Sequence, residues 1–157
     1  MYSYHIKDSF FTDIEQALGT KNTHLMSNKE NEGYRPHFLC VKDARNPDIY
    51  WAVPQSTKVE KYKNQIKIKK EKYGHCDTIV IGLFAQKENA FLIQNMFPIT
   101  QNYIDHVHTI DGNAVAIHKN LEKKIISKVK KVLKAKNRGI KLVFPDIDAI
   151  YNFLQNK

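Results

Sequence analysis

The sequence lacks the features that mark several common protein classes. Its two cysteines, Cys40 and Cys76, lie in separate apolar segments without a CxxC pairing. We expect both to be buried small hydrophobes, and no zinc-ligand spacing is present. No segment approaches the roughly 18 apolar residues of a membrane span, and the N-terminus lacks the pattern of a signal peptide. The sequence therefore predicts a cytoplasmic protein in a reducing compartment, with no membrane partner.

The usual enzyme signatures are also missing. The chain has no glycine-rich phosphate loop, no nucleophile elbow and no HExxH helix. It has no cluster of carboxylates suited to a two-metal nuclease. We therefore expect neither a metal nor a cofactor, and any RNA cleavage would have to use the ribose 2′-OH as its nucleophile.

Apolar residues and positive charge are abundant. Apolar residues make up 42% of the 157 residues, including eight Phe and eight Tyr, which is enough for a buried core. Lysine and arginine number 25 against 16 acidic residues, a formal net charge of +9. This excess favours a polyanionic partner. The alternative is that it only keeps the protein soluble, but the lysines are clustered rather than spread.

The N-terminal part of the chain predicts a strand, a helix, a loop and a hairpin. We expect the helix to be capped by Asp8 or Ser9 and to end at Gly19. Pro54 should end the hairpin's second strand because proline cannot donate to a ladder. The strand, helix, exposed loop and two hairpin arms are predicted at residues 2–7, 8–18, 20–33, 37–42 and 49–53.

The remainder predicts a second hairpin and three helices. Strands are expected at 78–85 and 90–96, with residues 97–100 breaking the second one. Helices are expected at 58–73, at 115–136 and after Pro145, each with an apolar stripe. Residues 102–113 are ambiguous apart from a turn at Asp111-Gly112. The whole chain, residues 1–157, reads as one α+β domain with a mostly antiparallel sheet covered by helices.

The most suggestive cluster for chemistry is Ser56-Thr57-Lys58. It supplies two hydroxyls and a cation where a strand meets a helix N-terminus, which favours binding of a phosphate. The structural alternative is that Ser56 or Thr57 merely caps the helix. His37 is a candidate general acid or base, His5 is a second candidate, and Tyr4 is a candidate hydroxyl donor.

The RNA-binding surface is expected on the lysine-rich helices and around Tyr34 and Arg35. Repulsion among so many like charges is unfavourable in an isolated helix, and a bound polyanion would relieve it. A solvated helix face is the alternative. The candidate lysines are Lys61, Lys63, Lys67, Lys70, Lys123 and Lys130.

The segment Tyr50-Trp-Ala-Val-Pro-Gln-Ser-Thr-Lys resembles the ToxN/AbiQ/CptN toxins of type III toxin–antitoxin systems. The segment Asn95-Met-Phe-Pro-Ile99 is similar to a later signature of that family. The order of the predicted elements also matches, so the resemblance covers essentially the whole chain. Ser56 and Lys58 are the firmest matches. The family usually has proline at the position of Thr57, and often lysine at that of His37.

The resemblance implies a fold and a function. The fold would be a strongly curved, mostly antiparallel sheet like the Kid/MazF barrel, with surrounding helices. The activity would be metal-independent endoribonuclease cleavage of cellular or phage mRNA as a defence against phage. The inhibitor would be an antitoxin RNA, a repeat pseudoknot that the toxin processes and then holds in a closed protein–RNA assembly.

Two other functions compete with this reading. A non-catalytic RNA- or DNA-binding module would use the same charge without cutting the strand, although no helix-turn-helix, RRM or KH signature is present. A small-molecule hydrolase would need Cys40 or Cys76 in a polar setting beside a histidine, whereas Cys40 lies in the apolar run Phe38-Leu39-Cys40-Val41.

Overall fold

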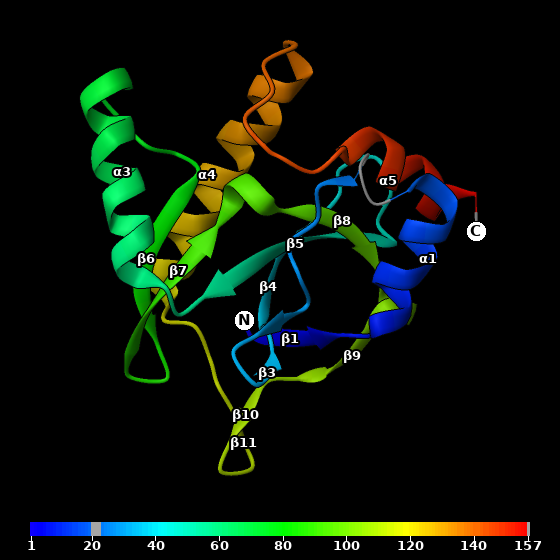
Figure 1. Cartoon of the computed structure of the whole chain (residues 1–157), viewed down its shortest axis with the longest axis horizontal. Helices are drawn as coiled ribbons and strands as arrows, with labels where there is room; N and C mark the ends of the chain where they lie inside the picture. Colours follow the sequence, from blue (N-terminus) through cyan, green and yellow to red (C-terminus); the bar gives the residue numbers. More distant parts are fainter. Residues whose placement is uncertain (20–22, 157) are drawn as a thin grey trace.

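The computed structural model describes residues 1–19 and 23–156, which form an α+β fold with a mostly antiparallel sheet (Figure 1). The described α-helices are α1 (Asp8–Leu18), α3 (Val59–Tyr73), α4 (Lys119–Asn137) and α5 (Ile147–Gln155). The strands of the main sheet are β1 (Ser3–Ile6), β4 (His37–Lys42), β5 (Ile49–Ser56), β6 (Ile79–Phe84), β7 (Lys87–Leu92), β8 (Phe97–Thr100) and β9 (Ile104–Val107). Two small hairpins, β2 (Lys29–Glu30) with β3 (Gly33–Tyr34) and β10 (Thr109–Ile110) with β11 (Asn113–Ala114), complete the strands.

The sheet is an open path in the order β6-β7-β5-β4-β1-β9, with β8 paired to β5. No closed or curled barrel is found among the described strands. Strand β5 is central because it pairs with β4 along one edge and with β8 and then β7 along the other. Through this change of partner, β5 joins the β6–β7 hairpin to the strands β4, β1, β9 and β8.

The prediction that Pro54 ends its strand was wrong. Pro54 lies within β5 opposite His37, and the strand continues through Gln55 and Ser56. On the other edge, Ala52 is the last residue paired with β8, and Gln55 is the first paired with β7. Pro54 therefore occupies the place where β5 changes neighbours, where its missing N–H is not needed by a ladder. Gln55 and Ser56 are consequently buried residues of the same strand.

Several element boundaries also differ from the predictions. Residues 97–100 form strand β8 on the edge of β5 instead of simply breaking a strand. The expected loop 20–33 contains β2 and two buried residues, Thr23 and Asn28, although positions 20–22 lie outside the described residues. Helix α4 begins at Lys119, four positions later than expected from 115, and Lys7 takes the N-cap position of α1.

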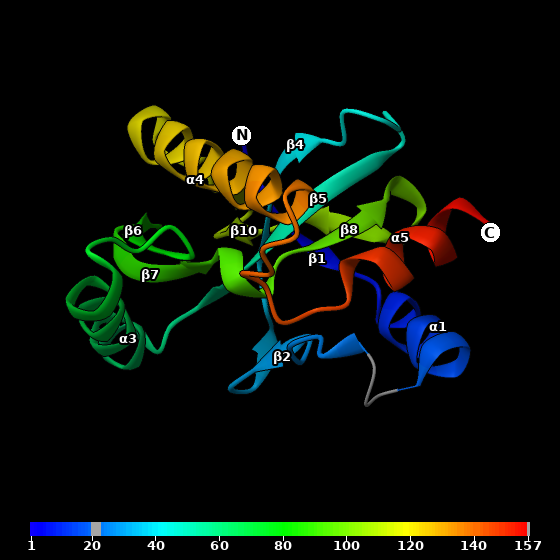
Figure 2. The same ribbon diagram turned by 90° about the horizontal axis from the view of Figure 1, so that it is seen from above.

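The helices cover the sheet through three apolar clusters. Helix α4 packs Ile125 and Val129 against β4–β7, and helices α1 and α5 pack on β8 and the start of β5. Helix α3 contributes Tyr62 to a smaller cluster with β6 and β7. Viewed from above, β6 and β7 lie between α4 and α3 (Figure 2). As a result α3 stands at one end of the molecule with most of its surface in water.

The structure also bears on the predicted burial of the cysteines and on the predicted absence of a membrane span. Cys40 and Cys76 are both buried free thiols, as predicted, and burial raises the pKa of Cys40 to about 12. Among the described residues, no helix is long and apolar enough to span a bilayer.

Candidate active site

The predicted Ser56-Thr57-Lys58 segment lies where β5 passes into α3. Ser56 is the last residue of β5 and is buried, whereas Thr57 and Lys58 are exposed. The backbone N–H of Lys58, the N-cap residue of α3, donates to Oγ of Ser56 at 3.2 Å. The polar groups of the segment are therefore held at the positive end of the helix dipole.

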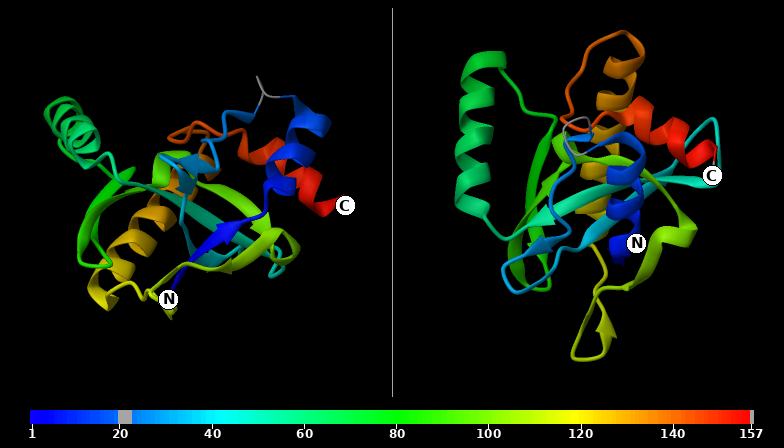
Figure 3. Two further views of the ribbon diagram at one scale, coloured as in Figure 1. Left: turned by 60° about the horizontal axis from the view of Figure 1, so that its bottom comes forward. Right: turned by 45° about the vertical axis from the view of Figure 1, so that its right-hand side comes forward.

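These polar groups converge on the carboxylate of Glu30, in the β2–β3 hairpin. The hydroxyl of Ser56 donates to Oε2 of Glu30 at 2.5 Å. The backbone N–H and the hydroxyl of Thr57 both donate to Oε1 at 2.8 Å. Both views in Figure 3 show this hairpin beside the end of β5, where the chain enters α3.

A fourth donor comes from Arg35. Its Nη1 lies 2.9 Å from Oε2 of Glu30 and also donates to the carbonyl of Gln55 at 2.9 Å, while its Nε donates to the carbonyl of Ser27 at 3.0 Å. Arg35 is only 5% exposed. The expectation that Arg35 contacts RNA from the surface therefore does not fit this geometry, because its guanidinium faces inward and holds Glu30.

Glu30 is a carboxylate at neutral pH. Burial pushes its pKa up, but the hydrogen bonds from Ser56 and Thr57 and the charge of Arg35 outweigh burial and leave the pKa below its usual range. Four donors fill the four lone-pair positions of the two oxygens. We call the donor set of Ser56, Thr57 and Arg35 the anion cradle. In this structure the cradle holds the protein's own anion.

Sequence reasoning missed Glu30. It belongs to a polar segment without periodicity, and nothing in its local pattern separates it from Glu32. A weak signal for the hairpin was present in the residue types of Asn31 and Gly33, which favour tight turns. In the structure Asn31 has a φ of 59°, as such a turn requires. The contact between Glu30 and Ser56 joins residues 26 positions apart and follows only from the tertiary structure.

His37 is not placed as an acid or base for RNA. Its side chain is 1% exposed, its Nδ1 lies 3.0 Å from the carbonyl oxygen of Arg35, and its ring packs edge-on against Phe97. Burial, assisted by the charge of Arg35, lowers the pKa of His37 to about 3. The neutral ring therefore belongs to the core beneath the cradle, and proton exchange with bound RNA is not open to it.

Tyr4 and His5 lie on opposite faces of β1. Tyr4 is half-buried and packs against the apolar cluster that contains Phe97 and Ile99. Nε2 of His5 lies 2.8 Å from Nδ1 of His108, and the ring of His5 stacks on that of His106 with 4.7 Å between centroids. Among the described residues, no group of three potential ligands is arranged to hold a metal ion.

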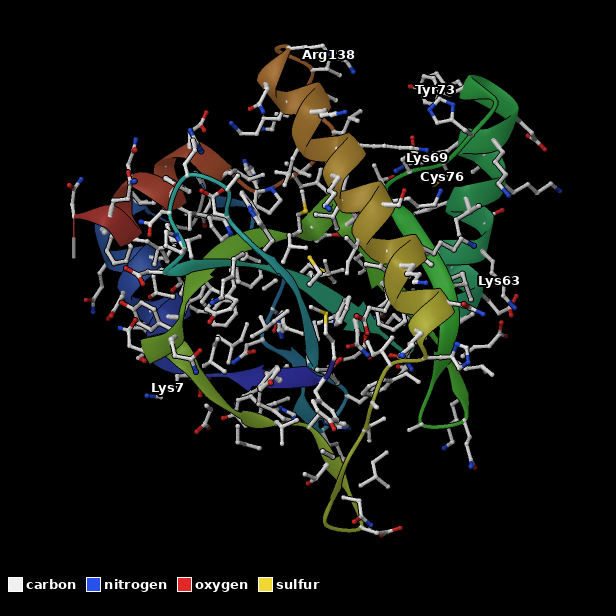
Figure 4. All side chains as sticks on the ribbon, turned by 180° about the vertical axis from the view of Figure 1, so that it is seen from behind. Lys7, Lys63, Lys69, Tyr73, Cys76 and Arg138 are labelled. Atoms are coloured by element: carbon white, nitrogen blue, oxygen red, sulfur yellow. The ribbon has the colours of Figure 1, made fainter. Side chains whose placement is uncertain are left out.

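The predicted RNA-binding lysines are exposed. Lys63 is engaged by Glu88 at 2.9 Å and Glu60 at 3.7 Å, so part of its charge is already neutralised. Figure 4 shows Lys63 on the outer side of α3, with Lys7 on the opposite side of the molecule. Tyr34 is 46% exposed, and its hydroxyl donates to Asp8 at 2.9 Å. Of the predicted RNA-binding lysines, those without an ion pair in the described chain are Lys61, Lys67, Lys70, Lys123 and Lys130.

No protein-family model matches the chain, and no curated protein matches its sequence.

Proposed function

We propose that this chain is the endoribonuclease toxin of a type III toxin–antitoxin system and that it cleaves RNA without a metal. The observation that carries the proposal is the anion cradle. Ser56, Thr57 and Arg35 converge on one carboxylate at the N-terminal end of α3, beside the exposed Lys58. Hydrogen-bond donors, a cation and a helix N-terminus are the groups that bind a phosphate.

The proposed substrate phosphate exchanges with Glu30. A phosphodiester presents two oxygens in the same way as a carboxylate. The cradle donors could therefore donate their hydrogen bonds to it once the β2–β3 hairpin moves aside. The ribose 2′-OH would then attack the adjacent phosphorus and the bond from phosphorus to the 5′ oxygen would break, giving a 2′,3′-cyclic phosphate and a 5′-OH. The proton of the 2′-OH would pass to water, and water would return a proton to the leaving 5′ oxygen. Ser56, Thr57 and Lys58 would stabilise the charge that develops on the phosphorane oxygens. No metal or cofactor enters this scheme.

The proposed partners are RNAs in the cytoplasm. The substrate is cellular or phage mRNA, and the inhibitor is a repeat pseudoknot RNA held in a closed assembly with the toxin. Exposed lysines on α3 and α4 would contact the backbones of both. The expected likeness to the Kid/MazF fold extends only to a mostly antiparallel sheet with surrounding helices, because the described strands form no closed or curled barrel.

One observation favours a second candidate, the non-catalytic RNA-binding module. The cradle is filled by Glu30, and the burial of His37 keeps this histidine from transferring a proton there. A module that only binds RNA would need the lysine surface but not the cradle. The two functions are therefore separated by variants of Ser56 and Lys58.

Growth under induced expression tests the proposal in cells. We expect the wild-type chain to stop growth, Lys58→Ala to restore it at equal protein level, and co-expressed repeat RNA to restore it for the wild type. Unimpaired growth with soluble wild-type protein would contradict a toxin function.

A further inference from the structure

A cavity opens at the end of α3 opposite the anion cradle. It encloses about 640 Å³ between the C-terminal turn of α3, the chain entering β6 and the segment before α5. Tyr73 and Phe144, which line it, are 61% and 56% exposed, and Leu142 is 41% exposed. Figure 4 shows Tyr73 near Lys69 and Cys76 in this region. Two large aromatic rings thus face water around one hollow.

The cavity is positively charged. The ammonium of Lys69 is half-buried and donates to the neutral oxygens Oγ1 of Thr78 and Oε1 of Gln94, each at 2.7 Å. No carboxylate in the described chain lies within ion-pair distance of it, and burial lowers the pKa of Lys69. The one carboxylate among the lining residues, Asp77, is engaged by Lys128 at 3.3 Å and His75 at 3.5 Å. An anionic ligand would therefore be attracted to this hollow.

Exposed aromatic rings beside an uncompensated cation suit a nucleotide. Bases stack on aromatic side chains without regard to sequence, and lysines attract the accompanying phosphates. The volume is within the range of small-ligand sites and is ample for one base with its sugar. We propose that this cavity binds an unpaired base of a single-stranded RNA whose backbone continues along α3 to the anion cradle.

The dimensions of α3 define how the two sites cooperate. Its 15 residues span roughly 22 Å, so several nucleotides separate the cradle from the cavity. The exposed lysines Lys61, Lys67 and Lys70 lie on the helix between them. The cavity would set the direction and the minimum length of the strand. This part rests on the proposed function, because the cradle is where that function places the scissile phosphate.

The test measures binding without cleavage. The probe is a fluorescent single-stranded 2′-O-methyl RNA octamer, which has no free 2′-OH, and the comparison probe is the same sugar–phosphate chain without bases. We expect Tyr73→Ala and Phe144→Ala each to weaken octamer binding about 5-fold or more and to leave binding of the base-free chain unchanged. Ile68→Ala, on the same helix and at a 54% exposed residue outside the cavity lining, is the matched control.

Two outcomes would overturn the inference. In the first, Tyr73→Ala binds the octamer as tightly as Ile68→Ala. That result would mean that the rings do not stack on a base and serve another contact, such as one with a protein surface. In the second, Tyr73→Ala weakens both probes equally, which would mean that no base is read. Failure of the proposed function appears separately, as unmodified RNA that the wild type binds but does not cut.

Discussion

Ser56 donates its hydroxyl to Oε2 of Glu30 at 2.5 Å, which closes the candidate active site with an anion from the protein itself. Arg35 shares the same oxygen from the buried side at 2.9 Å. Both side chains of the Glu30–Arg35 pair are less than a tenth exposed, at 9% and 6%. The closed cradle is therefore both a stabilising contact and an obstacle to a phosphate.

Glu30→Gln should open the cradle to inorganic phosphate. The variant leaves the buried Arg35 without its counter-charge, which we expect to lower the free energy of unfolding by about 3–5 kcal/mol in chloride buffer. Phosphate should restore part of this loss by binding the vacated donors. Thermal unfolding in phosphate and in chloride, at equal ionic strength, measures both effects.

The matched control for that experiment is Glu88→Gln, which removes one of the two carboxylates paired with the exposed Lys63. We expect it to show neither the destabilisation nor the added response to phosphate, because surface ion pairs contribute little. A Glu30→Gln variant whose response to phosphate equals that of wild type would show that the cradle does not bind the anion.

Ser56→Ala and Lys58→Ala should separate catalysis from stability. Removing one donor that stabilises the developing charge lowers the cleavage rate about 10²–10³-fold, and we expect this of both variants. Lys58 is exposed, so its loss should change the free energy of unfolding by less than about 0.5 kcal/mol. The loss of Ser56 deprives Glu30 of a buried hydrogen bond and should cost about 1–3 kcal/mol.

Single-turnover cleavage and denaturant unfolding of the same preparations test these values. Ser9→Ala, at an exposed residue of α1, serves as the hydroxyl control and should behave as wild type. Full cleavage activity in both Ser56→Ala and Lys58→Ala would move the active site away from α3.

Charge reversal on α3 should weaken RNA binding and reduce its dependence on salt. Lys67→Glu with Lys70→Glu removes two exposed cations, which lowers the slope of log affinity against log salt by about 1.4 for a single strand. Titrations at several salt concentrations give this slope. The double variant Lys7→Glu with Lys42→Glu changes the net charge equally at exposed sites outside the lysine helices and should keep the wild-type slope.

His37 should make the fold sensitive to acid. Its folded pKa of about 3 is lower than the ordinary 6.5, so the unfolded chain takes up the proton first. The stability from its neutral burial is complete above the unfolded pKa and declines by about 1.4 kcal/mol per pH unit as pH falls through that window toward 3. The free energy of unfolding of His37→Gln, measured against pH, should lack this contribution to the slope. The exposed-site variant His75→Gln should retain it.

Much of the fold followed from local patterns. The apolar stripe of Leu121, Ile125, Val129, Val132 and Leu133 predicted the inner face of α4, of which Ile125, Val129 and Val132 are buried and the two leucines partly buried. Pro145-Asp146 predicted the start of α5, where Asp146 accepts from the N–H of Ala149. These features depend on spacing within one element. The extension of β5 through Pro54 was not predicted. A proline fits at this position because β8 ends its pairing at Ala52 and β7 begins at Gln55, and no local pattern specifies where those two strands lie.

The candidate site also contains residues that local patterns predicted and residues that only the tertiary structure brings there. Ser56, Thr57 and Lys58 were predicted at a strand–helix junction, and the structure places them there. Glu30 and the inward turn of Arg35 were not predictable, because they depend on a hairpin of two-residue strands folding back against β5. The burial of His37 was not predicted. A histidine that precedes an apolar run can lie at an exposed strand end or at one that is packed in the core, and the sequence does not distinguish the two.

Cleavage of labelled RNA in excess EDTA tests the central claim most directly, with wild type and Ser56→Ala compared side by side. We predict that the wild type yields fragments ending in 2′,3′-cyclic phosphate and 5′-OH, and that Ser56→Ala binds the RNA but yields almost none. Intact RNA with the wild type, or fragments that disappear when EDTA is added, would contradict metal-free cleavage at this cradle.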